Sequence, residues 1–433
     1  MAFPMNVLPA PRWSRQGDFI YVSTLFPIDA EGAVVRSASI SPHLGESEVA
    51  AQTKALTGAL GDILAEAGSS LDLTLKAEVY LVDASDFYEF KLAWKDAFPV
   101  APPARLTAVC GDDHIIPGVR LSLVAVALHS DAAERRQVIN IDTVPDPMDA
   151  EWCPQAVKAD PFVFMSGYPA TDFETGIPVK TNPVAPFYAS DTELQAQYMF
   201  ENWGKVLEAA GSDLTQCVKT HALEIDLHNF HDLDGVWDKY MGHQAGTSPP
   251  TRASMAMPDL LVPGAIFIAN AQFIAPDDEH QKVESRKGIA WHPEDIRKVH
   301  FTPGIEVGRW FFMAGQVSCP DYENFGFTQA PKGLPHYWSD IEIQVHGTMD
   351  LLKNQLAAHD LDLTHVVDAR VFLCWAQRDY RGFERAWRQV WEPTGHMPTL
   401  NLIPSNQATG DGGIMMPELL IEIDLIAHRD HTA

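Results

Sequence analysis

One pattern of residues occurs three times along the 433-residue chain, and this repeat constrains the fold more than any other feature of the sequence. Each copy begins with an aromatic residue, followed by an apolar segment that predicts a strand ending in small residues. The strand endings align at Ser23, Ser166 and Ala314. A glutamine follows 29 or 30 residues later, each time four residues after an acid that suits the first turn of a helix. These glutamines are Gln52, Gln195 and Gln344.

The second half of each copy is equally regular. Segments rich in β-branched and apolar residues predict half-buried strands at 76–83, 219–226 and 368–375. A second helix is expected after each strand, because large apolar residues recur there at the spacing i, i+3 and i+7. Its caps are expected at Asp86, Asn229 and Asp379. A Pro-rich turn and two closing strands complete each copy, so we predict an α+β unit with two helices on one face of a mixed sheet.

The ends of the copies are marked by turn residues and polar linkers. The first helix of each copy is expected to end at a residue that adopts the left-handed conformation, which is Gly68, Gly211 or Asp360. Charged stretches near 133–137 and 277–287 separate the copies. We therefore expect unit 1 at residues 1–135, unit 2 at 136–283 and unit 3 at 284–433.

Charge and cysteine content exclude several classes of function. Thirty-one lysines and arginines against 58 aspartates and glutamates leave a formal net charge of −27, which repels nucleic-acid phosphates and anionic membrane surfaces. The five cysteines have no CxxC spacing and form an odd total, which fits a reducing cytosol better than a disulfide framework. The sequence shows no signal-peptide pattern and no apolar run of about 18 residues. We expect a soluble cytoplasmic protein without nucleic-acid or membrane partners.

In these motifs the chain resembles the RidA family, also called the YjgF family. The resemblance is carried by the strand ends VSTLFPID, MSGYPATD and MAGQVS, the strand-to-helix junction VYLVDASDF and the PPAR turn. It covers the chain three times over, and it is strongest in the first copy and weakest in the third. Family members are usually single units assembled as homotrimers. The resemblance therefore implies a monomeric intrachain pseudo-trimer with clefts between its units, and leaves homodimerisation open.

The resemblance also implies which residues line the clefts. In the family, an arginine after the proline turn grips the substrate carboxylate, and it falls on Arg105 and Arg252, with Thr399 in unit 3. A glutamate on the last strand helps to position or activate water. It falls on Ser122 in unit 1, Asn270 in unit 2 and Glu422 in unit 3. No single repeat retains both groups, so only a cleft between repeats could combine them.

Further cleft residues follow from the same resemblance. The aromatic residue that lines the cleft falls on Trp13, Trp152 and Phe301. The small residues at the strand ends, Ser23 and Ser166, are substrate-binding candidates together with Tyr168 and Ser254. An asparagine of the family's second helix is replaced by Lys91, Asp234 and Glu384.

The residue types leave alternatives open at several of these positions. A guanidinium fork matches a carboxylate and stays charged, although an arginine beside a turn is also a common solvated charge. Glu422 and Asp424 share one strand face, where two carboxyls can act as acid and base, but a polar solvent face has the same alternation. The serines could bind a ligand or satisfy the strand end. The aromatic residues could stack on a substrate or belong to the core.

We predict a cofactor-free hydrolase of a small conjugated substrate that bears a carboxylate. The most favoured reaction is enamine or imine deamination, in which a C–N bond breaks and ammonia leaves, with Arg105, Arg252 and Glu422 as catalytic residues. The 17 histidines form no HExxH motif, and P-loop and GxGxxG motifs are absent from the sequence, so we expect no metal and no cofactor.

Three alternatives remain open. The first is another hydrolase or lyase chemistry on the same fold, as in the cyanuric acid hydrolases, barbiturases and chorismatases. A serine–lysine mechanism would require a lysine beside each strand-end serine, and none of these strand ends carries one. The second is a protein that binds a small ligand without turnover. The third is a ribonuclease, which the negative charge disfavours.

Overall fold

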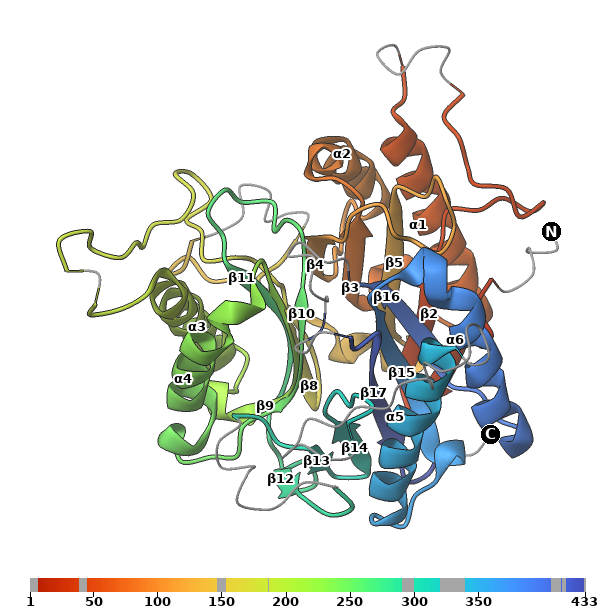
Figure 1. Ribbon diagram of the computed structural model, residues 1–433. Helices are drawn as coiled ribbons and strands as arrows, with labels where there is room; N and C mark the ends of the chain where they lie inside the picture. Colours follow the sequence, from red (N-terminus) through yellow and green to blue (C-terminus); the bar gives the residue numbers. More distant parts are fainter. Residues whose placement is uncertain are drawn as a thin grey trace.

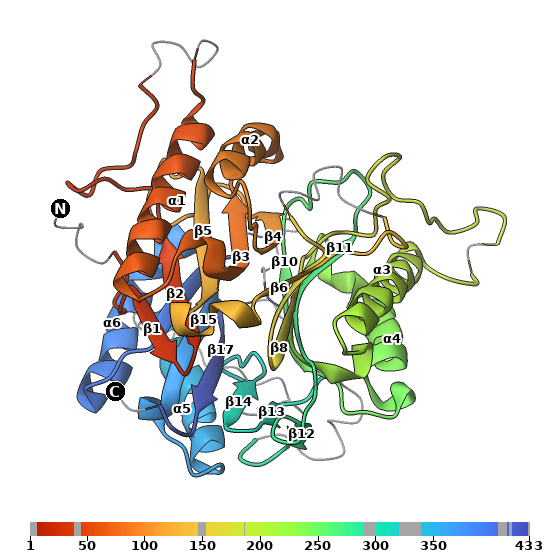
Figure 2. The ribbon, with the colours of Figure 1, turned by 180° about the vertical axis from the view of Figure 1, so that it is seen from behind.

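The computed structural model describes residues 7–38, 45–145, 153–185, 187–289, 300–319, 339–405, 414 and 418–431. Within these residues the chain forms three mixed sheets, each covered by two helices, in the order that the repeat predicts. Figures 1 and 2 show the three units around a common centre, with the sheets facing inward and the helices outward. The predicted α+β class with three tandem units is confirmed.

The units contain equivalent elements. Unit 1 contains β1 (Trp13–Gln16), β2 (Phe19–Leu25), α1 (Glu48–Glu66), β3 (Thr74–Leu81), α2 (Phe87–Ala97), β4 (Ala104–Val109) and β5 (Leu121–Leu128). Unit 2 contains β6 (Gln137–Ile139), β7 (Ala156–Ala159), β8 (Phe162–Met165), α3 (Asp191–Ala209), β9 (Cys217–Glu224), α4 (Phe230–Met241), β10 (Thr251–Ala256) and β11 (Phe267–Ile274). Unit 3 contains β12 (Lys282–Ser285), β13 (Gly304–Val307), β14 (Trp310–Met313), α5 (Asp340–Ala357), β15 (Val366–Leu373), α6 (Ala376–Trp391), β16 (Thr399–Pro404) and β17 (Ile421–His428).

The strand order is the same in all three sheets. In unit 1 it is β1-β2-β5-β3-β4, with β3 and β4 parallel and the other pairs antiparallel. Units 2 and 3 repeat this order and each adds an edge strand, β6 and β12, from the segment that precedes it. The boundary expected after residue 283 therefore falls within β12, a strand of the third sheet. The domain boundaries otherwise remain a prediction.

The repeated acid and glutamine have the same roles in each unit. The acids Glu48, Asp191 and Asp340 are the first residues of α1, α3 and α5. The side-chain amide of Gln52 donates to Gly118 O at 3.1 Å and accepts from Arg120 N at 2.7 Å, just before β5. The other two glutamines make the matching pair of contacts before β11 and β17. Each glutamine thus fixes the turn into the last strand of its sheet.

The predicted left-handed helix ends are confirmed, with φ of +78° at Gly68, +76° at Gly211 and +55° at Asp360. The helices α2 and α4 begin directly after Asp86 and Asn229, although neither side chain makes a capping hydrogen bond.

The cap predicted at Asp379 is wrong, because α6 already begins at Ala376. The carboxylate of Asp113, in unit 1, accepts hydrogen bonds from Ala376 N at 2.6 Å and Gln377 N at 3.1 Å. The cap of α6 therefore comes from another unit, which local sequence cannot indicate.

A shared core of aromatic side chains marks the pseudo-threefold axis. Phe19, Phe162 and Trp310 occupy equivalent positions at the starts of β2, β8 and β14. Their ring centroids are 5.1 Å, 5.7 Å and 6.1 Å apart in pairs, so the three rings form a triangle. Offset and edge-to-face contacts of this kind stabilise a core beyond the area that they bury. The same cluster contains buried residues from all three sheets.

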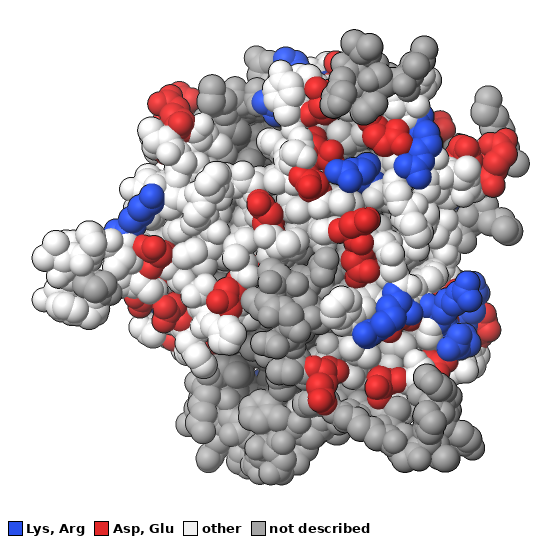
Figure 3. Space-filling model, turned by 45° about the horizontal axis from the view of Figure 1, so that its top comes forward, with Lys and Arg blue, Asp and Glu red and all other residues white. Residues whose placement is uncertain are grey.

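Figure 3 shows acidic side chains spread over one face of the molecule, with fewer lysine and arginine side chains among them. The basic side chains visible on this face do not form a continuous stripe. No helix among the described residues combines the length and the apolar character that a membrane-spanning segment requires.

Candidate functional site

The three units meet edge to edge in a cyclic order, and we name these interfaces seam 1–2, seam 2–3 and seam 3–1. In seam 1–2, Gly167 N donates to Arg105 O at 3.0 Å. In seam 2–3, Gly315 N donates to Arg252 O at 3.1 Å. In seam 3–1, Leu400 N donates to Ser23 Oγ at 2.9 Å. Each seam therefore joins the edge strand β4, β10 or β16 to the strand end of the next unit.

Arg105 is buried at seam 1–2, and no ion pair joins it to an acid in the part of the chain that the structure describes. Its guanidinium carbon lies 5.3 Å and 5.5 Å from the ring centroids of Phe90 and Trp94 on α2. The residue is 5% exposed, and its Nη1 has no hydrogen-bond partner among the described residues. Because a buried charge is costly until it is paired, this guanidinium is suited to hold an incoming anion.

Arg252 occupies the equivalent position in seam 2–3, but it is already paired. Its guanidinium carbon lies 4.5 Å from the ring centroid of Phe230 and 5.4 Å from that of Trp237, both on α4. Asp234, also on α4, forms a buried ion pair with Arg252. Nη2 carries this ion pair, but neither Nη1 nor Nη2 makes a hydrogen bond among the described residues, so the fork remains available to a ligand.

Seam 2–3 also brings Glu422 to the site. A Cβ on Gly315 would lie only 1.8 Å from Glu422 Oε1 and 2.9 Å from the Cβ of Ala253. The carboxyl group therefore lies against the glycine whose N–H binds Arg252 O. Burial, with the charge of Asp424, raises the pKa of Glu422 well above its ordinary value, against the opposing influence of Arg252 and Lys219. This seam combines the arginine and the glutamate that no single repeat contains.

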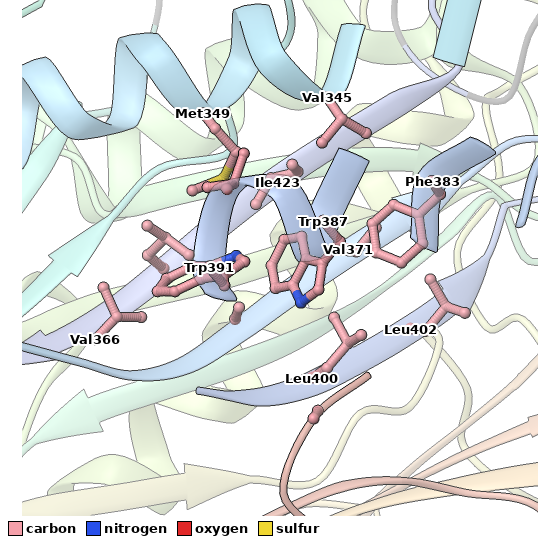
Figure 4. Close-up of a cluster of buried hydrophobic side chains, with 14 of the residues drawn as sticks. Val345, Met349, Val366, Val371, Phe383, Trp387, Trp391, Leu400, Leu402 and Ile423 are labelled. Carbon is pink, nitrogen blue, oxygen red and sulfur yellow. The ribbon is translucent and has the colours of Figure 1, made fainter. Parts of the chain in front are cut away.

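The structure corrects two of the sequence alignments. The register of β15 and β16 pairs Asp368 with Thr399, whereas Arg105 and Arg252 align with Leu400. Thr399 is therefore not the residue at the arginine position. Leu400 is fully buried in the core of unit 3, where Figure 4 shows it near Trp387. The expected loss of the carboxylate clamp in unit 3 still follows, because leucine offers no charge.

The second correction concerns the last strand. Glu422 is the second residue of β17, as Ser122 is of β5. The second residue of β11 is Ile268, and Asn270 lies two positions further along. The position of the family glutamate is therefore apolar in unit 2. A shift by two residues keeps the side chains on the same strand face, so the hydrophobic pattern could not reveal it.

The strand-end serines bind backbone across the seams. Ser166 Oγ donates to Pro154 O at 2.6 Å and accepts from Arg105 N at 3.0 Å. Ser23 Oγ donates to Pro11 O at 2.6 Å and accepts from Leu400 N, as described above. Both hydroxyls are thus occupied in joining two units, and Ala314 has no hydroxyl to offer in seam 2–3.

The structure places the other predicted cleft residues in different surroundings. Trp152 lies outside the described residues. Trp13 packs against the core of unit 1 and its Nε1 donates to Glu66 Oε1 at 3.3 Å. Phe301 follows His300, whose Nδ1 lies 3.3 Å from Asp238 Oδ1 on α4 of unit 2, so Phe301 is at seam 2–3.

Tyr168 and Ser254 are both in unit 2. Tyr168 lines a small apolar cavity of about 60 Å³ and its ring contacts that of Phe173 edge-on at 5.0 Å. Ser254 is buried two residues after Arg252 on β10, and its Oγ has no hydrogen-bond partner among the described residues. Of the two, only Ser254 is on the strand that carries Arg252.

Glu422 and Asp424 are both buried, which rules out the solvent-face interpretation. They do not form an acid–base pair, because Asp424 binds Lys219 at 2.7 Å and His221 at 2.9 Å near the axis. These two groups lower the pKa of Asp424 although burial opposes them.

Sequence reasoning missed two lysines that reach the strand ends from the preceding unit. Lys76 Nζ donates to Met165 O, beside Ser166, and Lys219 Nζ donates to Met313 O at 2.9 Å, beside Ala314. Their contacts are made across a seam, so inspection of the strand ends alone could not show them. No hydrogen bond joins either lysine to a serine among the described residues.

Glu224, at the end of β9, was also missed. It is fully buried, and neither of its oxygens has a hydrogen-bond partner among the described residues. Burial raises the pKa of Glu224 to about 8, with Arg252 opposing the rise and Asp234 adding to it. The equivalent residues, Leu81 and Leu373, are apolar. An acid at a position where the other two copies have leucine is a signal that sequence comparison of the repeats could have found.

Comparison with known proteins agrees with this architecture. A family model described as Endoribonuclease L-PSP matches residues 12–128 and 146–266, and thus most of units 1 and 2. A RutC family protein of Pyrococcus abyssi is 32% identical over 104 residues, which cover 24% of this chain and 74% of that protein. Reactive Intermediate Deaminase A of Arabidopsis thaliana is 33% identical over 86 residues, which cover 20% of this chain and 41% of that protein.

Two further likenesses cover most of the other protein. The 3-aminoacrylate deaminase RutC of Acinetobacter baylyi is 27% identical over 124 residues, which cover 29% of this chain and 90% of that protein. A crystal structure of chorismatase, 11% identical, matches 82% of this chain and 93% of its own with a TM-score of 0.48. From its two matched regions, its relatives and its three sheets, the chain belongs to the endoribonuclease L-PSP family, that of the RutC and RidA proteins, and carries RidA-like units in tandem.

Proposed function

We propose that this protein is a cofactor-free hydrolase that deaminates a small imine or enamine bearing a carboxylate, and that the reaction takes place at seam 2–3. The observation that carries the proposal is the meeting of Arg252 and Glu422 on either side of Gly315. Seam 1–2 has the arginine without the acid, and seam 3–1 has Leu400 and Ser122 in their places. Among the described residues, seam 2–3 is therefore the one that has both a group for the carboxylate and a group for proton transfer.

In the proposed reaction, water adds to the carbon of a C=N bond, the C–N bond breaks, and ammonia leaves while a keto acid remains. Arg252 holds the substrate carboxylate through Nη1, which orients the C=N carbon toward seam 2–3. Burial raises the pKa of Glu422 and so favours its protonated form, which in this reaction donates a proton to the nitrogen, and its carboxylate then accepts one from water.

The names of two relatives support this chemistry, since one is a reactive intermediate deaminase and the other a 3-aminoacrylate deaminase. The family description names an endoribonuclease instead. An RNA backbone requires a basic surface, whereas this chain has a net charge of −27 and the basic side chains visible in Figure 3 form no continuous stripe. The charge therefore favours the deaminase.

The test is ammonia release from 2-aminoacrylate generated in solution. The parent protein is expected to accelerate release, and Glu422→Gln to lower kcat by about 100-fold, because an amide cannot exchange the proton. Glu384→Gln, at a half-buried glutamate of α6 that is ion-paired with Arg388 and lies outside seam 2–3, is the matched control and is expected to keep the parent rate. A parent protein that leaves the spontaneous rate unchanged would exclude the deaminase.

A second function is favoured by one specific observation, Arg105 Nη1, which has no hydrogen-bond partner among the residues that the structure describes. Seam 1–2 could bind a small carboxylate such as pyruvate without turnover, because it offers a buried cation but has Ile268 at the position of the glutamate. Calorimetry with pyruvate tests this, and Arg105→Leu is expected to abolish the binding event. Binding that persists unchanged in this variant would place the ligand elsewhere.

A further inference from the structure

The face of unit 2 that lies under α4 contains several buried polar atoms without partners. Arg252 and Ser254 alternate along β10, opposite Thr220 and Ala222 of β9, and Glu224 pairs with Ala256 at the end of the two strands. Side chains two residues apart share a strand face, so these polar groups form one row beneath the helix. Arg252 Nη1, Ser254 Oγ and both oxygens of Glu224 lack hydrogen-bond partners among the described residues. Unpaired polar atoms at such depth indicate a site that is completed by a ligand.

The charges around this row do not suit a simple anion. The guanidinium of Arg252 is matched by Asp234, and two more carboxyl groups, Glu224 and Glu422, also lie within its electrostatic influence. Arg252 therefore faces three carboxyl groups, and Lys219, which also acts on Glu422, is itself paired with Asp424. A lone carboxylate that binds here gains little from a guanidinium that Asp234 already neutralises, and it further opposes the ionisation of Glu224 and Glu422.

Seam 1–2 provides an internal comparison. In seam 1–2, Leu81 stands in place of Glu224 and Lys91 in place of Asp234. Ile268 stands there in place of Glu422. The same fold thus surrounds one arginine with apolar and basic residues and the other with three acids. This difference changes the class of ligand that each seam can hold.

We propose that the site under α4 takes a small ligand that carries both a carboxylate and a positively charged nitrogen. The carboxylate binds Arg252 Nη1, and the nitrogen donates hydrogen bonds to Glu224 and Ser254. This inference deepens the proposed function, since it names the substrate class for the same site, and Glu224 is a binding residue that the sequence resemblance does not include.

A measurable proton release follows from this arrangement. Burial raises the pKa of Glu224 to about 8, so the carboxyl group of the empty site is mostly protonated at pH 7. A cationic nitrogen beside it favours the ionised form, so binding transfers the proton of Glu224 to the solvent. A ligand without the nitrogen leaves that proton in place.

Titration calorimetry with glycine and with acetate tests the proposal. The measurements use the Arg105→Leu variant, which removes the arginine of seam 1–2 and introduces the leucine that unit 3 has at this position. They are made at pH 7 in two buffers of different ionisation enthalpy. Glycine is expected to bind at least about tenfold more tightly than acetate and to release close to one proton per chain. Glu224→Leu, which places the residue of units 1 and 3 in unit 2, is expected to abolish both the preference and the release.

Glu224→Gln provides a second variant of nearly equal volume. It is expected to retain weak glycine binding through hydrogen bonds but to release no proton. If the Glu224 variants bind glycine as the starting protein does, or if glycine binds no better than acetate, the proposal is overturned. Ammonia release is measured separately. If the protein releases ammonia but glycine binding releases no proton, this inference is refuted and the proposed reaction stands. If glycine binding releases a proton but no ammonia is formed, only the proposed reaction is refuted.

Discussion

At the scale of single residues, a hydroxyl in the right place can join two units. Ser166 Oγ satisfies a carbonyl of its own unit and the buried N–H of Arg105 in the preceding one. The contact also fixes the strand position from which the Arg105 side chain projects. Two backbone groups therefore depend on one side chain at seam 1–2.

Substitution Ser166→Ala is expected to lower the free energy of unfolding by about 1–3 kcal/mol, because the N–H of Arg105 remains buried without an acceptor. Alanine fits the position sterically, since Ala314 occupies it in unit 3. Urea titration of parent and variant measures the change. Ser85→Ala, at an exposed loop position, is the control, and an equal effect of both substitutions would contradict the role given to Ser166.

Glu224, unlike Ser166, is buried without hydrogen-bond partners among the described residues, and this burial opposes the ionisation of its carboxyl group. Its pKa is about 8 in the folded protein and near 4.5 in the unfolded chain. The unfolded state therefore loses its proton first as the pH rises. The stability associated with the neutral carboxyl is fully present below about pH 4.5 and is lost as the pH rises through 8.

We expect the stability difference between Glu224→Leu and the parent protein to grow from pH 5 to pH 8.5 in favour of the variant, by an amount on the order of 3 kcal/mol. Chemical denaturation at a series of pH values measures it. A difference that stays constant over this range would show that Glu224 ionises normally in the folded state.

The sequence predicted some of these residues well and others not. Arg105 and Arg252 were identified through the family resemblance, and the proline turn before each of them fixes its position on an edge strand. The alignment of Thr399 failed by one residue and that of Asn270 by two, since neither the turn nor the alternation determines register in a diverged copy. Glu224 lacks hydrogen-bond partners because of the way α4 and β10 pack around it, so no local sequence pattern indicates this.

At the scale of the elements, the three copies differ most informatively at the end of the first helix. Gly68 and Gly211 adopt positive φ without strain, whereas Asp360 adopts φ +55° with a side chain. The helices were predictable because acids, apolar spacing and C-terminal turns repeat. The start of α6 was not, because Asp113 caps it from unit 1.

Two exchanges between the copies test this element. Asp360→Gly is expected to stabilise the protein by about 0.5–1 kcal/mol, and Gly211→Asp to destabilise it by a similar amount, because only glycine adopts this conformation without a penalty. Gly211 suits the test, since the nearest atom to an added Cβ is Lys158 Nζ at 3.8 Å. Thermal unfolding of both variants checks the two signs, and a destabilised Asp360→Gly would refute the argument.

At the scale of the whole molecule, the single chain allows the axis to be asymmetric. Glu78, His221 and Arg370 occupy equivalent positions on β3, β9 and β15. Arg370 binds Glu78 through two hydrogen bonds of 2.6 Å and 2.7 Å. A homotrimer would bring three identical residues together at this point and could not form such a pair. Because the units of a single chain can carry different residues at equivalent positions, tandem fusion permits complementary charges around the axis. For the same reason it permits seams that differ in their residues.

Glu78→Gln is expected to destabilise the protein by about 3–5 kcal/mol at pH 7, because it leaves Arg370 buried without a counter-charge. The double variant Glu78→Leu with Arg370→Met is expected to recover most of that loss. Burial would raise the pKa of Glu78, but Arg370 and its neighbours lower it to about 2. The carboxylate therefore stabilises the fold above about pH 4.5 and progressively less toward pH 2, and this acid dependence should be absent from the double variant.

The repeat, with the family resemblance, predicted the pseudo-trimer and the inequality of its clefts, but not which seam combines the arginine with the glutamate. The cyclic order of the units decides which arginine meets which acid, and that order is a property of the folded ring. The sequence could state only that a cleft between repeats might combine the two groups, whereas the structure assigns the combination to Arg252 and Glu422.

The most direct measurement compares kcat/KM for ammonia release from 2-aminoacrylate in Arg252→Leu and in Arg105→Leu. Both variants introduce the residue that unit 3 already has, and Arg252→Leu also leaves the buried Asp234 without its ion-pair partner, so the stability of both variants is measured beside the rate. We predict that Arg252→Leu loses at least about 100-fold, because it removes the group that orients the substrate, while Arg105→Leu stays close to the parent value. Equal losses in the two variants, or a loss confined to Arg105→Leu, would contradict the assignment of the reaction to seam 2–3.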